Sequence, residues 1–540
     1  MVFSRLAETM LPSGGVVDVL KQIYAACDTR SCYIALLSAF GAAAVYRVAY
    51  SFFFSPLRNI RGPWLARLTS LRADILIASG FMWKLARNDF AEYGDLFVTM
   101  PDAVTVCDPD DIRMLLGNPT VNKASFYRIL KFTGIENTLS YQNNADALVR
   151  HRQIGPFLKT GYLSKMEDTI MREGVISIKN KWDKLLDESP SSAVEVNYSD
   201  DFTIGVFGII STLVYGRKIK ELNDNSADTA IWIKKSLSFL GTRSMVNMLP
   251  SFVSRILLSP WEHYYTRLSN YTHESISQRK SHLNELETSG KDNERPTDLL
   301  QALIDAEDAE SKSKMSYDEI HSECLLMMQA GTDTTSQTIS TTLHLLLLHP
   351  HYHNMAVDEV RSQFSPDHVV TYNECRDKLP FLEACFFESL RLEPVTGGIL
   401  GRTAPKGGVT IKGQFIPEGT SLLVNLAAAN RHSRHWDRPL EFDPTRFIGN
   451  RDARNKIMTF SYGRRACPGR QLAWWEMLTI LANVLKDYDL KVPSDCTHFG
   501  PDVLGENGYP KTMDWRMFIT IKPENSERDC RVLVSRATTA

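Results

Sequence analysis

The stretch FSYGRRACPGRQ, residues 460–471, places one cysteine in an unusual setting. Cys467 lies in a turn between Gly463 and Gly469, with arginines at positions 464, 465 and 470. Glycines permit a tight turn and a close approach to a flat ligand. Nearby arginines and the N-terminus of a following helix favour a thiolate over a thiol. A thiolate serves either as a nucleophile or as a soft metal ligand.

An isolated cysteine is usually a small apolar core residue, and a nucleophilic one needs a base, yet no histidine lies near Cys467 in sequence. The pattern Phe460-x-x-Gly463-x-Arg465-x-Cys467-x-Gly469 sets this cysteine apart. It resembles the haem-binding signature of the cytochrome P450 family, with every position filled. The resemblance implies that Cys467 is the axial thiolate ligand of haem b. It also implies that Arg465 contacts a haem propionate and that Phe460, Gly463 and Gly469 shape the haem-binding loop.

Two further motifs extend the resemblance. Glu388 and Arg391, in FFESLRLEP, lie three residues apart and so share one helix face, and their apolar neighbours indicate burial. FDPTRF, residues 442–447, places Arg446 where the family has a third partner. The resemblance implies that Glu388, Arg391 and Arg446 form a structural triad that fixes the core on the haem side.

The segment AGTDTTS, residues 330–336, lies within an apolar stretch that predicts a helix ending at Pro350. Polar residues inside a buried helix compete for its backbone carbonyls. By resemblance, Asp333 and Thr334 form the acid–alcohol pair that relays protons during O₂ activation, which is general acid catalysis. The alternative is a polar stripe on a face between helices.

The propionates of haem require cationic partners. Arg402, at the start of a predicted strand, resembles a second propionate ligand besides Arg465. The family usually takes a third cation from a WxxxR pattern, but NNADALVRHRQIGPF lacks the tryptophan. Arg150 is the candidate here, with Arg152 as the alternative and His151 between them.

Residues 31–54, SCYIALLSAFGAAAVYRVAYSFFF, are apolar or small except for Arg47. A spanning helix needs about 20 such residues. The arginines that follow place the remainder of the chain on the cytosolic side. We therefore expect an N-terminal segment (1–31), a transmembrane anchor (32–54), a hinge (55–63) and a catalytic domain (64–540), in the endoplasmic reticulum membrane. The alternative for the apolar run is a buried core helix.

The composition is that of an ordinary globular protein, with 43% hydrophobic and 23% charged residues in 540. A formal net charge of −2 argues against nucleic acid as a partner. Nine cysteines without a CxxC pair indicate mostly unpaired thiols in a reducing compartment. Helical periodicity dominates 145–350, and short β-branched runs between glycines and prolines follow at 401–425. The sequence therefore predicts a mainly α fold with a minor β portion, as in cytochromes P450.

The resemblance implies a haem-thiolate monooxygenase that hydroxylates, epoxidises or desaturates a hydrophobic small molecule. No GxGxxG motif is present, so we expect the electrons of NADPH to arrive through a separate NADPH–cytochrome P450 reductase. The substrate stays open among terpenoids, steroids, polyketides and alkaloids. PLRNIRGPWLARLTSL is similar to the hinge of fungal members, which favours secondary metabolism. Two alternatives are a haem-thiolate isomerase or dehydratase that does not use O₂, and a non-catalytic haem- or lipid-binding membrane protein.

Overall fold

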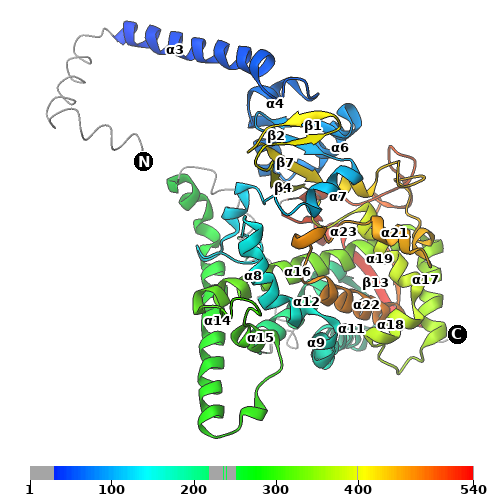
Figure 1. Cartoon of the computed structure of the whole chain (residues 1–540). Helices are drawn as coiled ribbons and strands as arrows, with labels where there is room; N and C mark the ends of the chain where they lie inside the picture. Colours follow the sequence, from blue (N-terminus) through cyan, green and yellow to red (C-terminus); the bar gives the residue numbers. More distant parts are fainter. Residues whose placement is uncertain are drawn as a thin grey trace.

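Helix α16 (Tyr317–Leu348) crosses the middle of the computed structural model, and other helices pack around it (Figure 1). The structure describes residues 29–217, 235, 239, 251–397, 399–517 and 519–538. The other α-helices are α3 (Thr29–Ala49), α4 (Trp64–Leu68), α5 (Leu71–Ala78), α6 (Met82–Tyr93), α7 (Pro109–Gly117), α8 (Asn144–Ile154), α9 (Thr160–Leu163), α10 (Glu167–Ile170), α11 (Ser177–Glu188), α12 (Tyr198–Tyr215), α14 (Ser251–Thr288), α15 (Leu299–Asp305), α17 (Pro350–Gln363), α18 (Tyr372–Lys378), α19 (Pro380–Leu392), α20 (Leu426–Asn430), α21 (Arg451–Lys456), α22 (Arg470–Asp487) and α23 (Ser526–Asp529).

The strands are short and form small sheets. They are β1 (Leu96–Met100), β2 (Ala103–Val106), β3 (Ala193–Asn197), β4 (Ile399–Thr403), β5 (Val409–Ile411), β6 (Gln414–Ile416), β7 (Ser421–Asn425), β8 (Tyr488–Lys491), β9 (Gly500–Leu504), β10 (Pro510–Lys511), β11 (Trp515–Met517), β12 (Ile521–Pro523) and β13 (Arg531–Arg536). The largest sheet has the order β1-β2-β7-β4, and a three-stranded sheet has the order β3-β13-β8. The predicted fold class, mainly α with a minor β portion, is confirmed.

Helix α16 begins at a capping box, in which Ser316 and Glu319 each satisfy a backbone N–H of the other. Its hydroxyl side chains bond back to carbonyls one turn earlier, as Thr338 does to Thr334 and Thr342 to Thr338. These bonds satisfy several of the hydroxyls inside the helix, which stays continuous from Tyr317 to Leu348. The polar run therefore does not break the helix at residues 330–336.

The largest apolar core surrounds α16 with residues from α12, α19 and α22. Gly331 explains the close approach of α12, because a Cβ on this residue would lie 2.8 Å from Cδ1 of Ile210. A second core lies under the four-stranded sheet. There β2 pairs in parallel with β7, so that Ala103 faces Ser421 across more than half of the chain.

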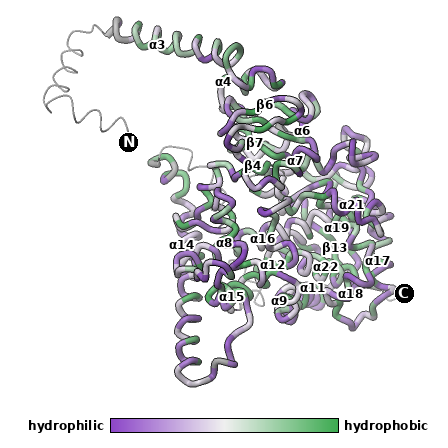
Figure 2. The backbone as a smooth tube through the Cα atoms, viewed as in Figure 1, coloured by the Kyte–Doolittle hydropathy of each residue, from purple (hydrophilic) through white to green (hydrophobic). Residues whose placement is uncertain are grey.

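Helix α3 projects away from the body of the protein (Figure 1), and its exposed residues are coloured mostly from white to green in Figure 2. The span Tyr33–Phe54 has 22 residues and is apolar and long enough to cross a membrane. Arg47 lies near its end, and its Nε donates a hydrogen bond to the carbonyl of Leu68 at 3.0 Å. Most of the predicted N-terminal segment, residues 1–28, lies outside the described residues.

Candidate active site

Cys467 lies in the loop between a short 3-10 turn (Gly463–Arg465) and α22. Its N–H donates to the carbonyl of Phe460 at 2.8 Å, which closes the loop. Gly463 has a φ of +72°, and a Cβ there would lie 2.4 Å from the carbonyl oxygen of Leu116. Only glycine fits this position, because the strained φ and the backbone contact both exclude a side chain.

The side chain of Cys467 is exposed, yet it is surrounded by enough protein that burial raises the pKa of its thiol. The N–H groups of Gly469 and Arg470 and the charge of Arg470 act in the opposite direction. The positive charge near Cys467 thus favours the thiolate, as the sequence indicates, but burial outweighs this effect on the pKa. A coordinated metal ion deprotonates a thiol outright.

Ala330 on α16 is also exposed, although the helix is largely buried on both sides of it. An accessible cysteine deep in the protein and an accessible alanine within a central helix indicate space inside the fold.

Three buried cations gather near Cys467. Lys123, Arg402 and Arg465 are 7%, 2% and 9% exposed. Arg402 and Lys123 pair across a β-bridge, and the charges of Arg402 and Arg465 help burial to lower the pKa of Lys123. Burial and the charge of Arg402 lower the pKa of Arg465 to about 10. Their hydrogen bonds go to backbone carbonyls and to one amide side chain, not to carboxylates.

Among the described residues, no carboxylate forms an ion pair with any of these three cations. The Nε of Arg465 is buried without a hydrogen-bond partner. Uncompensated buried charges are costly, so the cluster calls for an anion. A ligand with two carboxylates would satisfy it.

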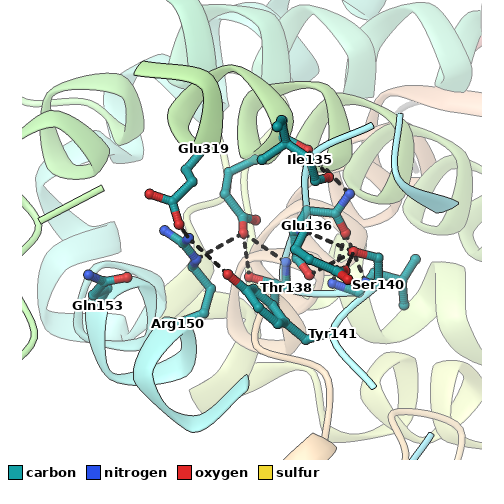
Figure 3. A network of polar contacts seen from close by, with 12 residues as sticks. Ile135, Glu136, Thr138, Ser140, Tyr141, Arg150, Gln153 and Glu319 are labelled. Atoms are coloured by element: carbon teal, nitrogen blue, oxygen red, sulfur yellow. Dashed lines mark hydrogen bonds and ion pairs between the residues drawn. The ribbon is translucent and has the colours of Figure 1, made fainter. Parts of the chain in front are cut away.

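Arg150 lies outside this cluster. Figure 3 shows its guanidinium turned toward Glu319 of α16, with which it forms an ion pair. Its Nε is also 3.4 Å from Oε1 of Glu323, a fully buried carboxyl whose pKa is raised to about 7 by burial. Arg152, the alternative, pairs with Asp308 at 2.5 Å. Both arginines therefore already have carboxylate partners.

His151, the residue between them, faces the cations instead. Burial and the charges of Arg465 and Lys123 lower the pKa of His151 to about 4. The predicted role of Arg150 in haem binding stays a prediction, and the contacts favour Lys123 in its place.

The loop between Thr138 and Tyr141 connects the cluster that contains Arg465 with the charged pair of Arg150 and Glu323. The carbonyls of Thr138 and Tyr141 accept hydrogen bonds from Arg465, at 3.2 and 2.8 Å. On the other side, the N–H of Thr138 donates to Glu323 at 2.7 Å. This loop therefore fixes Arg465 relative to α16.

The structure brings Glu388, Arg391 and Arg446 together. The first two form a bidentate pair at 2.6 and 2.7 Å, and both side chains are fully buried. Arg446 Nε lies 3.5 Å from Oε1 of Glu388, which also accepts the N–H of Asp443 at 2.8 Å. Arg391 donates in addition to the carbonyls of Pro439 and Glu441. The pair thus ties α19 to the segment that leads toward the cysteine loop.

Asp333 and Thr334 lie in the middle of α16, but neither bonds the other in this arrangement. The hydroxyl of Thr334 donates to the carbonyl of Ala330 at 2.7 Å. The buried carboxylate of Asp333 contacts Thr520 and Lys522 from the C-terminal hairpin. The carboxyl group of Asp333 and the hydroxyl of Thr334 therefore lie next to the accessible Ala330, and residues outside α16 hold the carboxyl group.

The comparisons with known proteins agree with this arrangement. A sequence model of the family "Cytochrome P450" matches residues 70–501. The chain belongs to the cytochrome P450 family. It is similar to the cytochrome P450 monooxygenase helB1 of Aspergillus fumigatus, with 41% identity over 94% of this chain and 87% of that protein. The monooxygenase helB2 of the same fungus is 37% identical over 92% of this chain and 97% of its own.

More distant relatives and a solved structure extend the similarity. The cytochrome P450 monooxygenase tpeC of Talaromyces stipitatus is 29% identical over 86% of this chain and 89% of that protein. The crystal structure of the cytochrome P450DA heme domain superposes with a TM-score of 0.71, at 20% identity, over 86% of this chain and 95% of its own, which shows the shared fold. The protein is a haem-thiolate monooxygenase of fungal type. It uses haem b and a redox partner that receives its electrons from NADPH.

The residues of this cytochrome P450 fit haem b. Cys467 is accessible and would supply a soft ligand for iron. The buried cations Lys123, Arg402 and Arg465 form no ion pair with a carboxylate side chain among the described residues, so they suit the two propionates of haem.

Sequence reasoning missed Lys123, His151, Thr520 and Lys522. Nothing in VNKASFYR marks Lys123, because its importance comes from a bridge to a residue far along the chain. The alternation of apolar and polar residues in ITIKP is a detectable signal for a strand there, although β12 begins only at Ile521, after Thr520.

Proposed function

We propose that Cys467 is the axial ligand of haem b, that Lys123, Arg402 and Arg465 bind its propionates, and that the enzyme oxidises a hydrophobic small molecule. The observation that supports this most strongly is the juxtaposition of an accessible thiol with three buried cations that lack carboxylate partners. When bound, haem b supplies the redox chemistry that activates O₂.

The protein's own residues have distinct tasks in this proposal. The turn at Gly463 presents the sulfur of Cys467, and the pair of Glu388 and Arg391 holds the segment that carries the turn. Asp333 and Thr334 hold and move the protons that the reaction consumes.

In hydroxylation or epoxidation, one oxygen atom of O₂ enters the product, the other leaves as water with two protons, and NADPH supplies two electrons. In desaturation, both oxygen atoms leave as water, and the substrate gives up two hydrogens in addition to the two electrons from NADPH. We place the electron source in a membrane-bound NADPH–cytochrome P450 reductase. Helix α3 with the following turn would anchor the enzyme in the endoplasmic reticulum, with residues 55–63 as a hinge and 64–540 as the catalytic domain. The similarity to monooxygenases of Aspergillus and Talaromyces supports a substrate from fungal secondary metabolism, such as a terpenoid, steroid, polyketide or alkaloid.

An isotope experiment tests this function. Membranes that contain the full chain and the reductase are given NADPH, isotopically heavy O₂ and a library of apolar metabolites selected by their ability to shift the haem absorbance. Hydroxylation or epoxidation predicts a product with one heavy oxygen atom, and desaturation predicts an unlabelled product with two fewer hydrogens, formed only with O₂ and NADPH. A product of unchanged composition, formed without O₂, would instead indicate an isomerase.

A further inference from the structure

The carboxylate of Asp333 is held from outside its own helix. Lys522 Nζ lies 2.6 Å from Oδ1, and the hydroxyl of Thr520 hydrogen-bonds Oδ2. Both oxygens of the acid are therefore engaged by one short segment. The side chain of Asp333 is 7% exposed, whereas that of Lys522 is 33% exposed. The ion pair thus joins the interior of the protein to its surface.

The segment that carries these partners is itself fixed. Strand β12 pairs with β11, so that Ile521 faces Met517. The N–H of Ile521 donates to the carbonyl of Val395 at 2.7 Å, and the N–H of Met517 donates to the carbonyl of Gly80 at 2.9 Å. The hairpin is therefore bonded on both sides to other parts of the chain, and it offers a rigid platform for the side chains it presents.

Thr520 lies in the turn directly before β12 and Lys522 lies within β12, and both side chains reach the carboxylate of Asp333. Thr520 is buried, with 5% exposure, which makes its hydroxyl a poor partner for water and a good one for a buried carboxylate.

An ionised carboxylate inside a protein needs such compensation, because desolvation otherwise drives it to take up a proton or to turn toward another partner. Charge-assisted hydrogen bonds are directional as well as strong. Two of them on opposite oxygens hold Asp333 in one orientation. The hydroxyl of the neighbouring Thr334 donates to the carbonyl of Ala330 one turn earlier in α16, so it does not compensate the carboxylate of Asp333.

Resting on the function proposed above, we propose that Lys522 and Thr520 are positioning residues of the proton relay. They keep the carboxylate of Asp333 oriented at the solvent end of the relay. Asp333 accepts a proton from water beside Lys522 and passes it toward Thr334, which returns Asp333 to its ionised form. Lys522 keeps its own proton throughout, and the hydroxide left by the donating water takes up a proton from bulk solvent, so no net charge is left behind.

The test uses the full chain in membranes with NADPH–cytochrome P450 reductase, NADPH and O₂ as the only reactants, because this reaction needs no known substrate. Lys522→Met should raise the hydrogen peroxide released per NADPH by roughly twofold or more, because slower proton transfer favours loss of partly reduced oxygen. It should also enlarge the solvent deuterium isotope effect on NADPH oxidation. Lys522→Arg should leave both values close to those of the wild type, because arginine keeps the positive charge.

Two controls separate positioning from general stability. Lys491→Met removes an exposed lysine from β8 and should change neither value. In an Asp333→Asn background, Lys522→Met should have no further effect, because the carboxylate it positions is gone. Unchanged peroxide yield and isotope effect in Lys522→Met, or full additivity with Asp333→Asn, would overturn the inference.

The carbon monoxide spectrum of each reduced variant keeps this test distinct from that of the proposed function. A wild type without a thiolate-type band would overturn the function, whereas a normal band with unchanged proton readouts would overturn only the role of Lys522. If Lys522→Met fails to fold, Thr520→Val carries the test with the same expected directions. It removes one hydroxyl and keeps the charge pair.

Discussion

At the scale of single residues, charge balance distinguishes the cations that we propose to contact haem from the structural ones. Arg150 and Arg152 each have carboxylate partners, whereas Lys123, Arg402 and Arg465 have only carbonyl and amide partners. A family pattern predicts Arg402 and Arg465, since both lie beside recognisable motifs. It does not predict Lys123, which reaches the site through a tertiary contact, nor the carboxylates that neutralise Arg150.

Lys123→Met is predicted to weaken haem binding. A hydrogen bond to a charged group contributes about 1.5–3 kcal/mol, which corresponds to a roughly 10- to 100-fold faster loss of haem. Transfer of haem to an excess of apomyoglobin measures this rate. Lys406→Met, at an exposed site on a neighbouring loop, serves as the matched control and should leave the rate unchanged. A loss of haem in Arg150→Met as fast as in Lys123→Met would contradict the assignment.

Glu323 is predicted to make stability depend on pH. Burial raises its pKa to about 7 in the folded protein, against about 4.3 in an unfolded chain. Between these values the folded state binds more protons, so this residue lowers stability as pH rises from about 4.3 to 7, and the effect then levels off. Glu323→Gln removes the dependence. The Tm of this variant minus the Tm of the wild type should therefore increase from pH 5 to pH 7.5.

Glu319, on the same helix, provides the control for this measurement. Burial alone would raise its pKa, but hydrogen bonds from Ser316 and the charge of Arg150 lower it. Its stabilising effect is lost only as pH falls below the range in which an unfolded carboxyl titrates. The Tm difference for Glu319→Gln should consequently be flat between pH 5 and 7.5. A flat profile for Glu323→Gln as well would show that Glu323 is ionised throughout.

At the scale of elements, the sequence predicts the type of each segment around the site better than its partners. The alternation at 96–106, the acidic cap at Asp108 and the apolar run of 471–485 predict the β1–β2 pair, α7 and α22, which the structure confirms. The parallel pairing of β2 with β7 depends on residues some three hundred positions apart, which no local pattern encodes. Gly331 is a similar case, because the residue that requires a glycine there, Ile210, lies on another helix.

Gly331→Ala is predicted to destabilise the packing of α12 against α16. The new Cβ would lie 2.8 Å from Cδ1 of Ile210, a residue with 1% exposure. Overpacking of this kind costs about 1–3 kcal/mol, partly offset by the higher helix propensity of alanine. Ile210→Val removes the clashing methyl group. Thermal unfolding of the two single variants and the double variant measures the coupling between the sites.

The double variant should be more stable than the sum of the two single losses predicts, because the added and removed methyl groups compensate in volume. Additive losses would show that α12 can shift to accommodate the alanine and that Gly331 is not required for the contact.

At the scale of the whole molecule, an exposed apolar helix stands apart from a body whose core surrounds α16 (Figure 1). Composition alone predicts a membrane span in this segment, and the exposure of α3 removes the alternative of a buried core helix.

The full chain is predicted to stay with membranes under alkaline carbonate extraction. Replacing Ile34, Leu37 and Val45 by lysine should release it, because charged residues in a span are costly and these exposed side chains pack against no core. Sequons at Asn197 and Asn270 report the orientation: a cytosolic body leaves both unmodified. Extraction of the unchanged chain by carbonate, or glycosylation of either asparagine, would contradict the predicted topology.

The central claim is that Cys467 ligates the haem iron, and the carbon monoxide difference spectrum of the reduced enzyme tests it most directly. The wild type and the matched variant Cys496→Ala, which changes a half-buried thiol elsewhere, should both give the red-shifted Soret band of thiolate-ligated haem. Cys467→Ala should lose this band completely. Persistence of the band in Cys467→Ala, or its absence from the wild type, would contradict the assignment.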